Sequence, residues 1–230
     1  MKRDGVSVII VVKNGERYLK QAIESVLNQT YRPSEILLVD GNSTDDTIKI
    51  GKSYPKINIL TQGNGGLANA RNLGIQHASH HFIAFLDHDD HWVPNKLEKQ
   101  VEIFLQAPQT QYCYGQVQLF LEEGIESRPG FEEHHFIREK IGRTPGTLIA
   151  RKSLFEKIGG FDPKYSIACD VDWFTRAADL KVKSEFIPEI LLHKRIHVSN
   201  LSSNVKTNKK ELFRVIKESL DRQQQVRQGF

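Results

Sequence analysis

The chain has 230 residues, and 32 Lys and Arg against 28 Asp and Glu give a formal net charge of +4. A single core in a chain of this length buries roughly 70–75% of the unfolded surface, so folding requires neither disulfides nor metal. Hydrophobic residues (39%) and charged residues (26%) are spread along the chain, which excludes collagen-like, mucin-like and wholly disordered proteins. The two cysteines, Cys113 and Cys169, lack CxxC spacing, which argues against a disulfide framework or a thiolate metal site.

No apolar run approaches the roughly 18–20 residues of a membrane span, and residues 1–4 lead directly into a strand-like segment. We therefore expect no signal peptide and a cytoplasmic protein, with the inner face of a membrane as an alternative location. A surplus of four charges is small, so we expect no nucleic-acid partner. Basic residues gather at 206–217, which suits an anionic substrate or a membrane surface as well as RNA.

Strand and helix signals alternate over the first 105 residues. Short β-branched apolar runs predict strands buried on both faces of a parallel sheet, and apolar residues spaced by three and four predict the helices between them. Ser43 or Thr44 should cap the second helix, with Asp45 and Asp46 in its first turn. The predicted strands are 6–12, 36–39, 57–60 and 82–86, and the other helices lie at 19–31, 67–77 and from Pro94 to about 105.

Four strand–helix units predict an α/β fold with an open, mostly parallel sheet flanked by helices. We assign residues 1–230 to one domain. The apolar stripe of the last helix lacks Trp, so we expect this helix to cap the core rather than to anchor the chain in a membrane. The less regular second half is predicted to hold a strand at 112–121, a polar loop at 122–143, helices at 153–158 and 172–180, extended chain at 186–197 and an amphipathic helix within 206–230.

Polar residues follow each of the first four predicted strands. They are Asn14, Asp40, Gly63–Gly66 and Asp87–Asp90. Ligands of open α/β sheets bind beyond the carboxyl ends of the strands, so these residues should share one functional edge.

The segment Asp87-His88-Asp89-Asp90 places three carboxylates within four residues. Hard oxygen ligands at an open site suit Mg²⁺ or Mn²⁺ holding a diphosphate. Short acidic motifs also match by chance, and Asp90 could simply belong to the first turn of the next helix. The position at the end of a buried strand, on the same edge as Asp40, favours the metal site.

The glycine-rich segment 63–68 matches the GxGxxA fingerprint of dinucleotide-binding proteins. That fingerprint normally lies in the first strand–helix turn, whereas this one follows the third strand, and the acidic cluster after it would repel a pyrophosphate without metal. We therefore favour a close approach of this backbone to a nucleotide, with Arg71 and Asn72 on the following helix, over nicotinamide or flavin binding.

These features in this order resemble the family-2 inverting glycosyltransferases, which have the GT-A fold. The resemblance runs from about Val6 to Ser203, and its specificity comes from the joint order of the motifs. The matching segments are 8–14, 38–45, 69–74, 86–90, 146–151, 159–162, 170–176 and 193–202. Cys169 stands where the family has the Glu of a Glu-Asp pair, Val11-Val12-Lys13 replaces a common Pro-Thr-Tyr, and Gly41 replaces a second Asp.

The resemblance implies that residues 1–111 bind a nucleotide-diphosphate sugar, UDP-linked by preference. Asp40 would accept a hydrogen bond from the imide of the base. Backbone near Val11 would flank the base, with Asn14 among the donor-binding residues. Arg71 would lie near the base or the phosphate.

The resemblance also implies the chemistry of the site. Asp87 would face the ribose or the sugar, with His88 beside it, and Asp89 would bind Mn²⁺ or Mg²⁺ bridging the diphosphate. His197 would be a further metal or diphosphate contact. Asp170, within the acceptor and catalytic half at about 112–205, would be the general base that deprotonates a hydroxyl of a glycan or lipid-linked glycan acceptor. Peripheral membrane contact would accompany such an acceptor.

Plainer interpretations stay open. Asp40 could only cap the second helix, Asp170 and Asp172 could only begin a helix, and Trp173 could be a wall of the acceptor site or a core residue. A sugar nucleotidyltransferase would also use an α/β sheet and an acidic metal site, but should carry a glycine-rich basic loop after strand one. A non-catalytic nucleotide- or glycan-binding module would keep Asp40 and lose the base.

Overall fold

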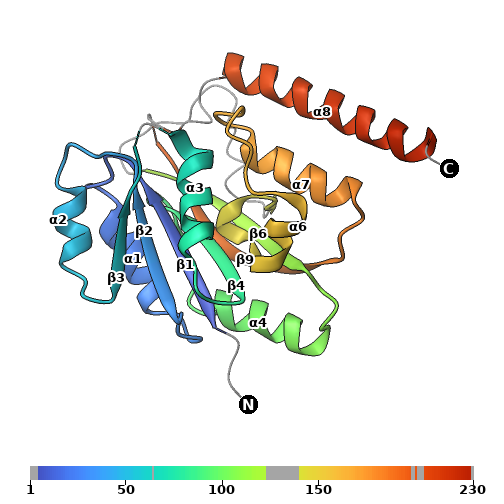
Figure 1. Ribbon diagram of the computed structural model, residues 1–230. Helices are drawn as coiled ribbons and strands as arrows, with labels where there is room; N and C mark the ends of the chain where they lie inside the picture. The colour runs from blue at the N-terminus through green and yellow to red at the C-terminus, as the bar shows by residue number, and fades with distance from the viewer. Residues whose placement is uncertain (1–4, 64, 123–139, 198–199, 201–204, 229–230) are drawn as a thin grey trace.

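The computed structural model describes residues 5–63, 65–122, 140–197, 200 and 205–228 (Figure 1). Within these ranges nine strands form one sheet in the order β3-β2-β1-β4-β8-β6-β9-β5, with β7 beside β6. The strands are β1 (Val6–Val12), β2 (Glu35–Asp40), β3 (Ile57–Thr61), β4 (Phe82–Asp87), β5 (His91–Trp92), β6 (Tyr112–Leu121), β7 (Lys140–Ile141), β8 (Ile149–Arg151) and β9 (Ser184–Ile196). The helices are α1 (Leu19–Leu27), α2 (Thr47–Lys52), α3 (Gly66–His77), α4 (Lys96–Gln106), α6 (Lys152–Ile158), α7 (Cys169–Asp179) and α8 (Val205–Gln228), with a 3₁₀ turn at Pro145–Thr147.

The first four strands are parallel, as their apolar sequences predict. All seven residues of β1 are buried, and β1 pairs with β2 on one side and β4 on the other. The register sets Val12 beside Asp40 and Val11 beside Asp87. The carboxyl ends of three neighbouring strands therefore bring the predicted donor-binding residues to one edge.

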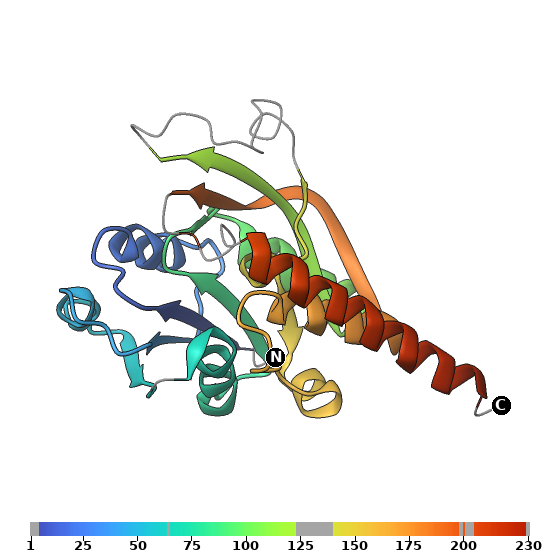
Figure 2. The same cartoon turned by 90° about the horizontal axis from the view of Figure 1, so that it is seen from above.

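The second half extends the same sheet with mixed strand directions. β8 runs antiparallel to β4 and to β6, whereas β9 runs parallel to β6 (Figure 2). The register between β6 and β9 shifts at Gly115, where a Cβ atom would lie 2.4 Å from Cδ1 of Leu191. The prediction of an α/β sheet flanked by helices is confirmed, and its antiparallel pairs belong to this half.

Helices cover both faces of the sheet because both faces are apolar. Val8 and Ile10 of β1 belong to a core cluster that contains buried residues of α1 and α4. Ile9 and Val11 point to the other face and belong to a cluster that contains residues of α3, α6 and α7. Burial of each such side chain contributes roughly 1.5–3 kcal/mol, which makes these two layers the main source of stability.

Three helix boundaries differ from the sequence-based prediction by three or more residues. α2 begins at Thr47 without a side-chain cap, so Ser43 and Thr44 do not cap it and Asp45 and Asp46 precede it. The cause is local, because Asp45 Oδ1 accepts hydrogen bonds from N–H (3.0 Å) and Oγ1 (2.5 Å) of Thr47 and holds a turn there. α1 ends at Leu27 rather than near Tyr31, and α7 begins at Cys169, three residues earlier than predicted.

The predicted C-terminal helix is confirmed as α8, which lies along α7 (Figures 1 and 2). Val215 is buried against the core, and Leu212 packs beside it. None of the helices in the described ranges is long and apolar enough to cross a membrane.

Candidate active site

Two loops at the ends of β1 and β2 are tied together around Asp40. Asp40 is 2% exposed, and its two carboxylate oxygens accept hydrogen bonds from the Ser43 N–H at 3.1 and 3.2 Å. Asn14 has a φ of 52°, donates its N–H to Ser43 Oγ (2.8 Å) and accepts from the Thr44 N–H (2.9 Å). Asp40 therefore caps the turn at 41–43 and not α2. The amide oxygen of Asn14 is already occupied by its hydrogen bond to the neighbouring loop.

Val11 and His88 meet through the backbone. Val11 is 3% exposed, and its carbonyl accepts the His88 N–H at 3.2 Å. The His88 ring lies against Gly15, where a Cβ atom would come within 2.5 Å of His88 Cδ2. The side chain of Val11 is thus part of the core. The contact of its backbone with the base, and the part of Asn14 in donor binding, stay predictions.

Arg71 is a buried cation that contacts the last residue of β4. It is 2% exposed and donates to Asp87 Oδ1 at 2.8 Å and to Cys169 Sγ at 3.5 Å. Its guanidinium lies 5.3 Å from the ring centre of Phe161, and its buried Nε has no hydrogen-bond partner among the described residues. Burial acts to lower the pKa of Arg71, but the charge of Asp87 and its hydrogen bond, together with the charges of Cys169 and Asp170, outweigh burial and raise the pKa.

Asp89 and His197 are in direct contact although 108 positions separate them. His197 Nε2 lies 2.9 Å from Asp89 Oδ2, and the Asn200 amide donates to the same oxygen at 3.3 Å. Burial acts against ionisation of Asp89, yet the hydrogen bond from His197 and the nearby charges of His88 and Lys194 lower its pKa to about 2. The two predicted metal ligands are therefore brought together.

Lys194 lies within the acidic cluster, and sequence reasoning did not single it out. Its Nζ is 3.8 Å from Asp90 Oδ2, and Asp90 also accepts the Arg195 N–H at 2.9 Å. The charge of Asp90, with smaller contributions from Asp87, Asp89 and Asp170, raises the pKa of Lys194 against the effect of burial. A fixed positive charge therefore faces all four carboxylates.

Asp170 and Asp172 lie in the first turn of α7 but differ in their surroundings. Asp170 is half-buried, accepts the N–H of Val171 at 2.8 Å, and has a pKa raised by burial, with the charge of Arg71 opposing the rise. Asp172 is 1% exposed and accepts Arg176 Nε at 2.8 Å. Arg176 in turn donates to the carbonyls of residues 158–160, so Asp172 is structural. Trp173 is fully buried and is a core residue.

Glu211 of α8 holds the loop that leads into α7. Its carboxylate accepts the backbone N–H groups of Ser166, Ile167 and Ala168, each at 2.9 Å, and the Ser166 hydroxyl at 2.7 Å. Asp170 follows this loop by two residues. Nothing near Glu211 in the sequence signals this contact, because its partners lie more than 40 positions away.

The side chains that could ligate a metal at this edge are compatible with a divalent cation that also binds substrate. In the ranges that the structure describes, no three His, Cys, Asp or Glu side chains gather as ligands for one ion. Mg²⁺ is usually held by one or two carboxylates together with substrate phosphates and waters, so a complete protein cage is not required. Asp89 and His197 could serve as the protein ligands of such an open site.

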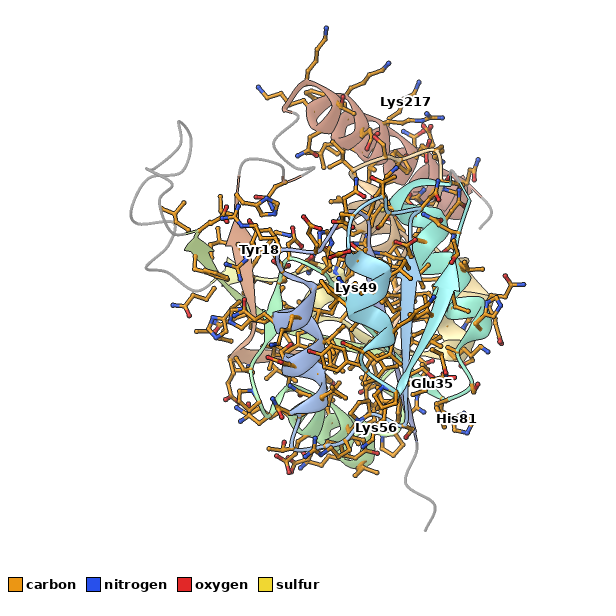
Figure 3. All side chains as sticks on the ribbon, turned by 90° about the vertical axis from the view of Figure 1, so that its left-hand side faces the viewer. Tyr18, Glu35, Lys49, Lys56, His81 and Lys217 are labelled. Atoms are coloured by element: carbon orange, nitrogen blue, oxygen red, sulfur yellow. The ribbon has the colours of Figure 1, made fainter. Side chains whose placement is uncertain are left out.

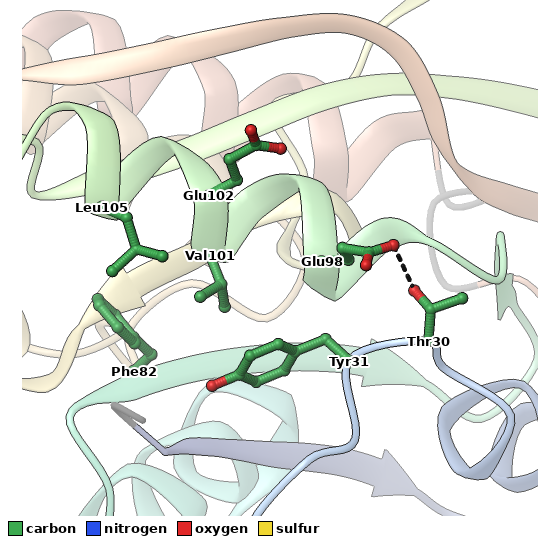
Figure 4. A pocket seen from close by; sticks show the side chains of 7 residues that line it. All are labelled: Thr30, Tyr31, Phe82, Glu98, Val101, Glu102 and Leu105. Carbon is green, nitrogen blue, oxygen red and sulfur yellow. Dashed lines mark hydrogen bonds between the residues drawn. The ribbon is translucent and has the colours of Figure 1, made fainter. Parts of the chain in front are cut away.

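A cavity of about 440 Å³ lies at the opposite end of the sheet (Figure 4). Tyr31, Val101 and Leu105 line it together with Phe82, the first residue of β4. Thr30 donates to Glu98 at 2.9 Å across its rim. Because substrates of open α/β sheets bind at the carboxyl ends of the strands, this cavity is separate from the candidate active site.

Comparison with known proteins decides the family. Residues 7–163 match the model of glycosyl transferase family 2. The chain belongs to this family. It is 33% identical to an uncharacterized glycosyltransferase of Rickettsia prowazekii, over 90% of this chain and 69% of that protein.

One further relative is similar in sequence, and one solved structure is similar in fold. The chain is 29% identical to the chondroitin synthase of Pasteurella multocida, over 95% of this chain but 23% of the synthase. The structure of S. aureus TarS 1-349 in complex with UDP-GlcNAc superposes with a TM-score of 0.67 at 19% identity, covering 87% of this chain and 61% of that chain. The GT-A fold and the glycosyltransferase family expected from the sequence motifs are confirmed.

Proposed function

We propose that this family-2 glycosyltransferase moves a sugar from a nucleotide-diphosphate donor, UDP-linked by preference, to a hydroxyl of a glycan or lipid-linked glycan, with inversion at the anomeric carbon. The observation that carries the proposal is the 2.9 Å contact between Asp89 and His197. It joins the two halves of the chain at the strand edge where open α/β sheets bind ligands. The complex of TarS with UDP-GlcNAc, a structure of the same fold, supports the choice of donor.

On the donor side, Asp40 is the group assigned to the base. Its oxygens already accept the Ser43 N–H, but each carboxylate oxygen has a second lone pair for the imide N–H of uracil. Arg71 sets the position of Asp87, which would meet the ribose or the sugar. A divalent cation held by Asp89 and His197 would neutralise charge on the departing diphosphate.

On the acceptor side, Asp170 is the proposed general base. Burial raises its pKa, and a higher pKa makes the carboxylate a better proton acceptor. Asp170 takes the acceptor proton as the hydroxyl oxygen attacks the anomeric carbon from the face opposite the leaving diphosphate. Asp170 is half-buried, whereas Asp172 is buried and its carboxylate is engaged by Arg176.

The test is a screen of nucleotide sugars for donor consumption, with Mn²⁺ and with EDTA, combined with calorimetry of UDP binding. We expect one UDP-sugar to be consumed in Mn²⁺, and UDP affinity to fall in EDTA and in Asp89→Ala. Asp46→Ala is the matched control, because Asp46 is exposed and pairs only with Lys49 among basic side chains of the described chain. Equal UDP affinity in Mn²⁺, in EDTA and in Asp89→Ala would contradict the proposed metal site. If no nucleotide sugar is consumed, the proposed transfer is wrong.

A further inference from the structure

Helix α8 has one face packed on the core and one face with large apolar side chains in solvent. Val215 and Ser219 are buried on the inner face. Phe213, Ile216 and Leu220 are 72%, 56% and 54% exposed on the outer face. Their spacing of three and four residues places them in a single stripe along the helix. Capping the core therefore accounts for only one side of α8.

Four exposed lysines accompany this stripe. At 100° per residue they lie within about 60° of Phe213 around the helix. The ion pairs of α8 involve Arg214, Glu218 and Arg222, and within the described part of the chain none of the four lysines has a carboxylate partner. The lysines are Lys206, Lys209, Lys210 and Lys217.

The first turn of α8 holds no acidic residue, although the positive end of the helix dipole favours acids there and disfavours lysines. The lysines at the start of α8 therefore do not stabilise the helix itself. Their concentration beside an exposed apolar stripe is the composition of a helix that lies in a membrane interface.

We propose that the outer face of α8 binds the surface of a membrane that contains anionic lipids. Phe213, Ile216 and Leu220 enter the boundary between headgroups and acyl chains, and the lysines contact lipid phosphates. A second copy of the chain fits this face less well, because a two-fold contact would set lysines against lysines. RNA would use the lysines but leave the apolar stripe in water.

The place of α8 in the fold agrees with this role. α8 lies at the end of the molecule toward which β1, β2 and β4 run, beside α7 (Figure 1). Lys217 is at that end, whereas Lys56 and His81 are at the opposite end (Figure 3). A membrane bound along α8 would therefore lie on the side of the candidate active site, where the lipid-linked acceptor of the proposed function would bind.

The test is co-sedimentation of the full chain with vesicles of phosphatidylcholine alone or mixed with phosphatidylglycerol. We expect binding to the mixed vesicles, weakened by salt, and little binding to phosphatidylcholine alone. The triple variant Phe213→Ser/Ile216→Ser/Leu220→Ser should lose binding. Lys209→Gln/Lys217→Gln should weaken it by about fivefold for each lysine removed.

Leu105→Ser is the matched control, since Leu105 is 71% exposed on α4 and should not affect binding. Phe213→Trp gives a second measurement that needs no destabilising change: its fluorescence should shift to the blue with mixed vesicles. Absence of that shift, or vesicle binding by the triple variant equal to that of the wild type, would overturn the proposal. So would a concentration-dependent dimer, seen by light scattering, that the triple variant abolishes. Because the readout is binding, the result is independent of the proposed transfer reaction.

Discussion

The two halves of the sheet contribute to the candidate active site in different ways. In the first half, Asp40 and Asp87 are the last residues of parallel strands, and buried apolar side chains fix the strands that carry them. In the second half, Asp170 and His197 are positioned by hydrogen bonds between segments far apart in sequence. The comparison indicates that strand packing positions the site residues of the first half and that long-range polar contacts position those of the second half, so the second half should respond more strongly to polar substitutions and to pH.

The largest expected effect concerns Asp170. Asp170→Asn keeps the shape of the side chain and its bond to the Val171 N–H but removes its proton affinity. Turnover should fall by about 10²–10⁴-fold, the range for loss of a general base. UDP affinity and the melting temperature should stay near the wild-type values, because the base acts in the transition state.

Asp172→Asn is the internal control, with the opposite pattern. Asp172 holds Arg176, and replacing its charge should reduce the free energy of unfolding by about 1.5–3 kcal/mol, measured by urea denaturation. Folded Asp172→Asn should keep its turnover. If Asp172→Asn abolishes transfer while Asp170→Asn leaves it intact, the assignment of the base is wrong.

The next largest effect is expected on the donor side, in the base selectivity that we assign to Asp40. UDP should compete better than ADP or GDP for donor binding, and Asp40→Ala should narrow that difference. A lost hydrogen bond to a charged acceptor is worth about 1.5–3 kcal/mol, so a change of roughly tenfold to hundredfold is expected in the selectivity. Unchanged selectivity in Asp40→Ala would mean that Asp40 serves only the turn at 41–43.

The same contrast explains what the sequence could predict. Asp40 and Asp87 were found because an acid that ends an apolar strand is visible locally. His197 and Asp170 were found only through resemblance to a family, and Lys194 and Glu211 were missed. Their partners lie far away in the chain, and no local pattern encodes such contacts. The predicted cap of α2 failed for two reasons: Asp45 engages Thr47 locally, and the Ser43 hydroxyl accepts the N–H of Asn14, which lies 29 positions away.

A smaller effect is expected at the contact between α8 and the loop before Asp170. Glu211→Ala removes the acceptor of three backbone N–H groups and should reduce the free energy of unfolding by about 1–2 kcal/mol, a typical loss for a helix cap. If Glu211 also positions the base, kcat should fall more than the donor KM changes. Glu211→Gln, which keeps an acceptor oxygen, should restore part of the turnover. An unaltered kcat in Glu211→Ala would limit Glu211 to a structural role.

The smallest expected effect is a pH dependence confined to α8. Asp179, the last residue of α7, accepts hydrogen bonds from Ser219, Arg222 and Gln223 of α8. Burial opposes ionisation of Glu211 and Asp179, but the hydrogen bonds they accept, with the charge of Arg222 beside Asp179, outweigh it and lower both pKa values. Carboxylates with lowered pKa values stabilise the fold above their ordinary pKa, and this stability is lost as the pH falls through the folded-state pKa. The protection of α8 amides against hydrogen exchange, relative to the intrinsic rate at each pH, should therefore fall below about pH 4 while that of β1 is retained. An equal loss of protection in both elements would contradict the difference between the halves.

The most direct test of the central claim, that both halves meet in one donor-binding site, is a double-mutant cycle on UDP affinity. Calorimetry in Mn²⁺ would compare wild type, Asp89→Ala, His197→Ala and the double variant. Because the two side chains are in contact and are proposed to hold the same ion, the double variant should bind UDP little worse than the weaker single variant. The expected coupling is about 0.5–3 kcal/mol. Strictly additive losses, or no loss for His197→Ala, would contradict the account.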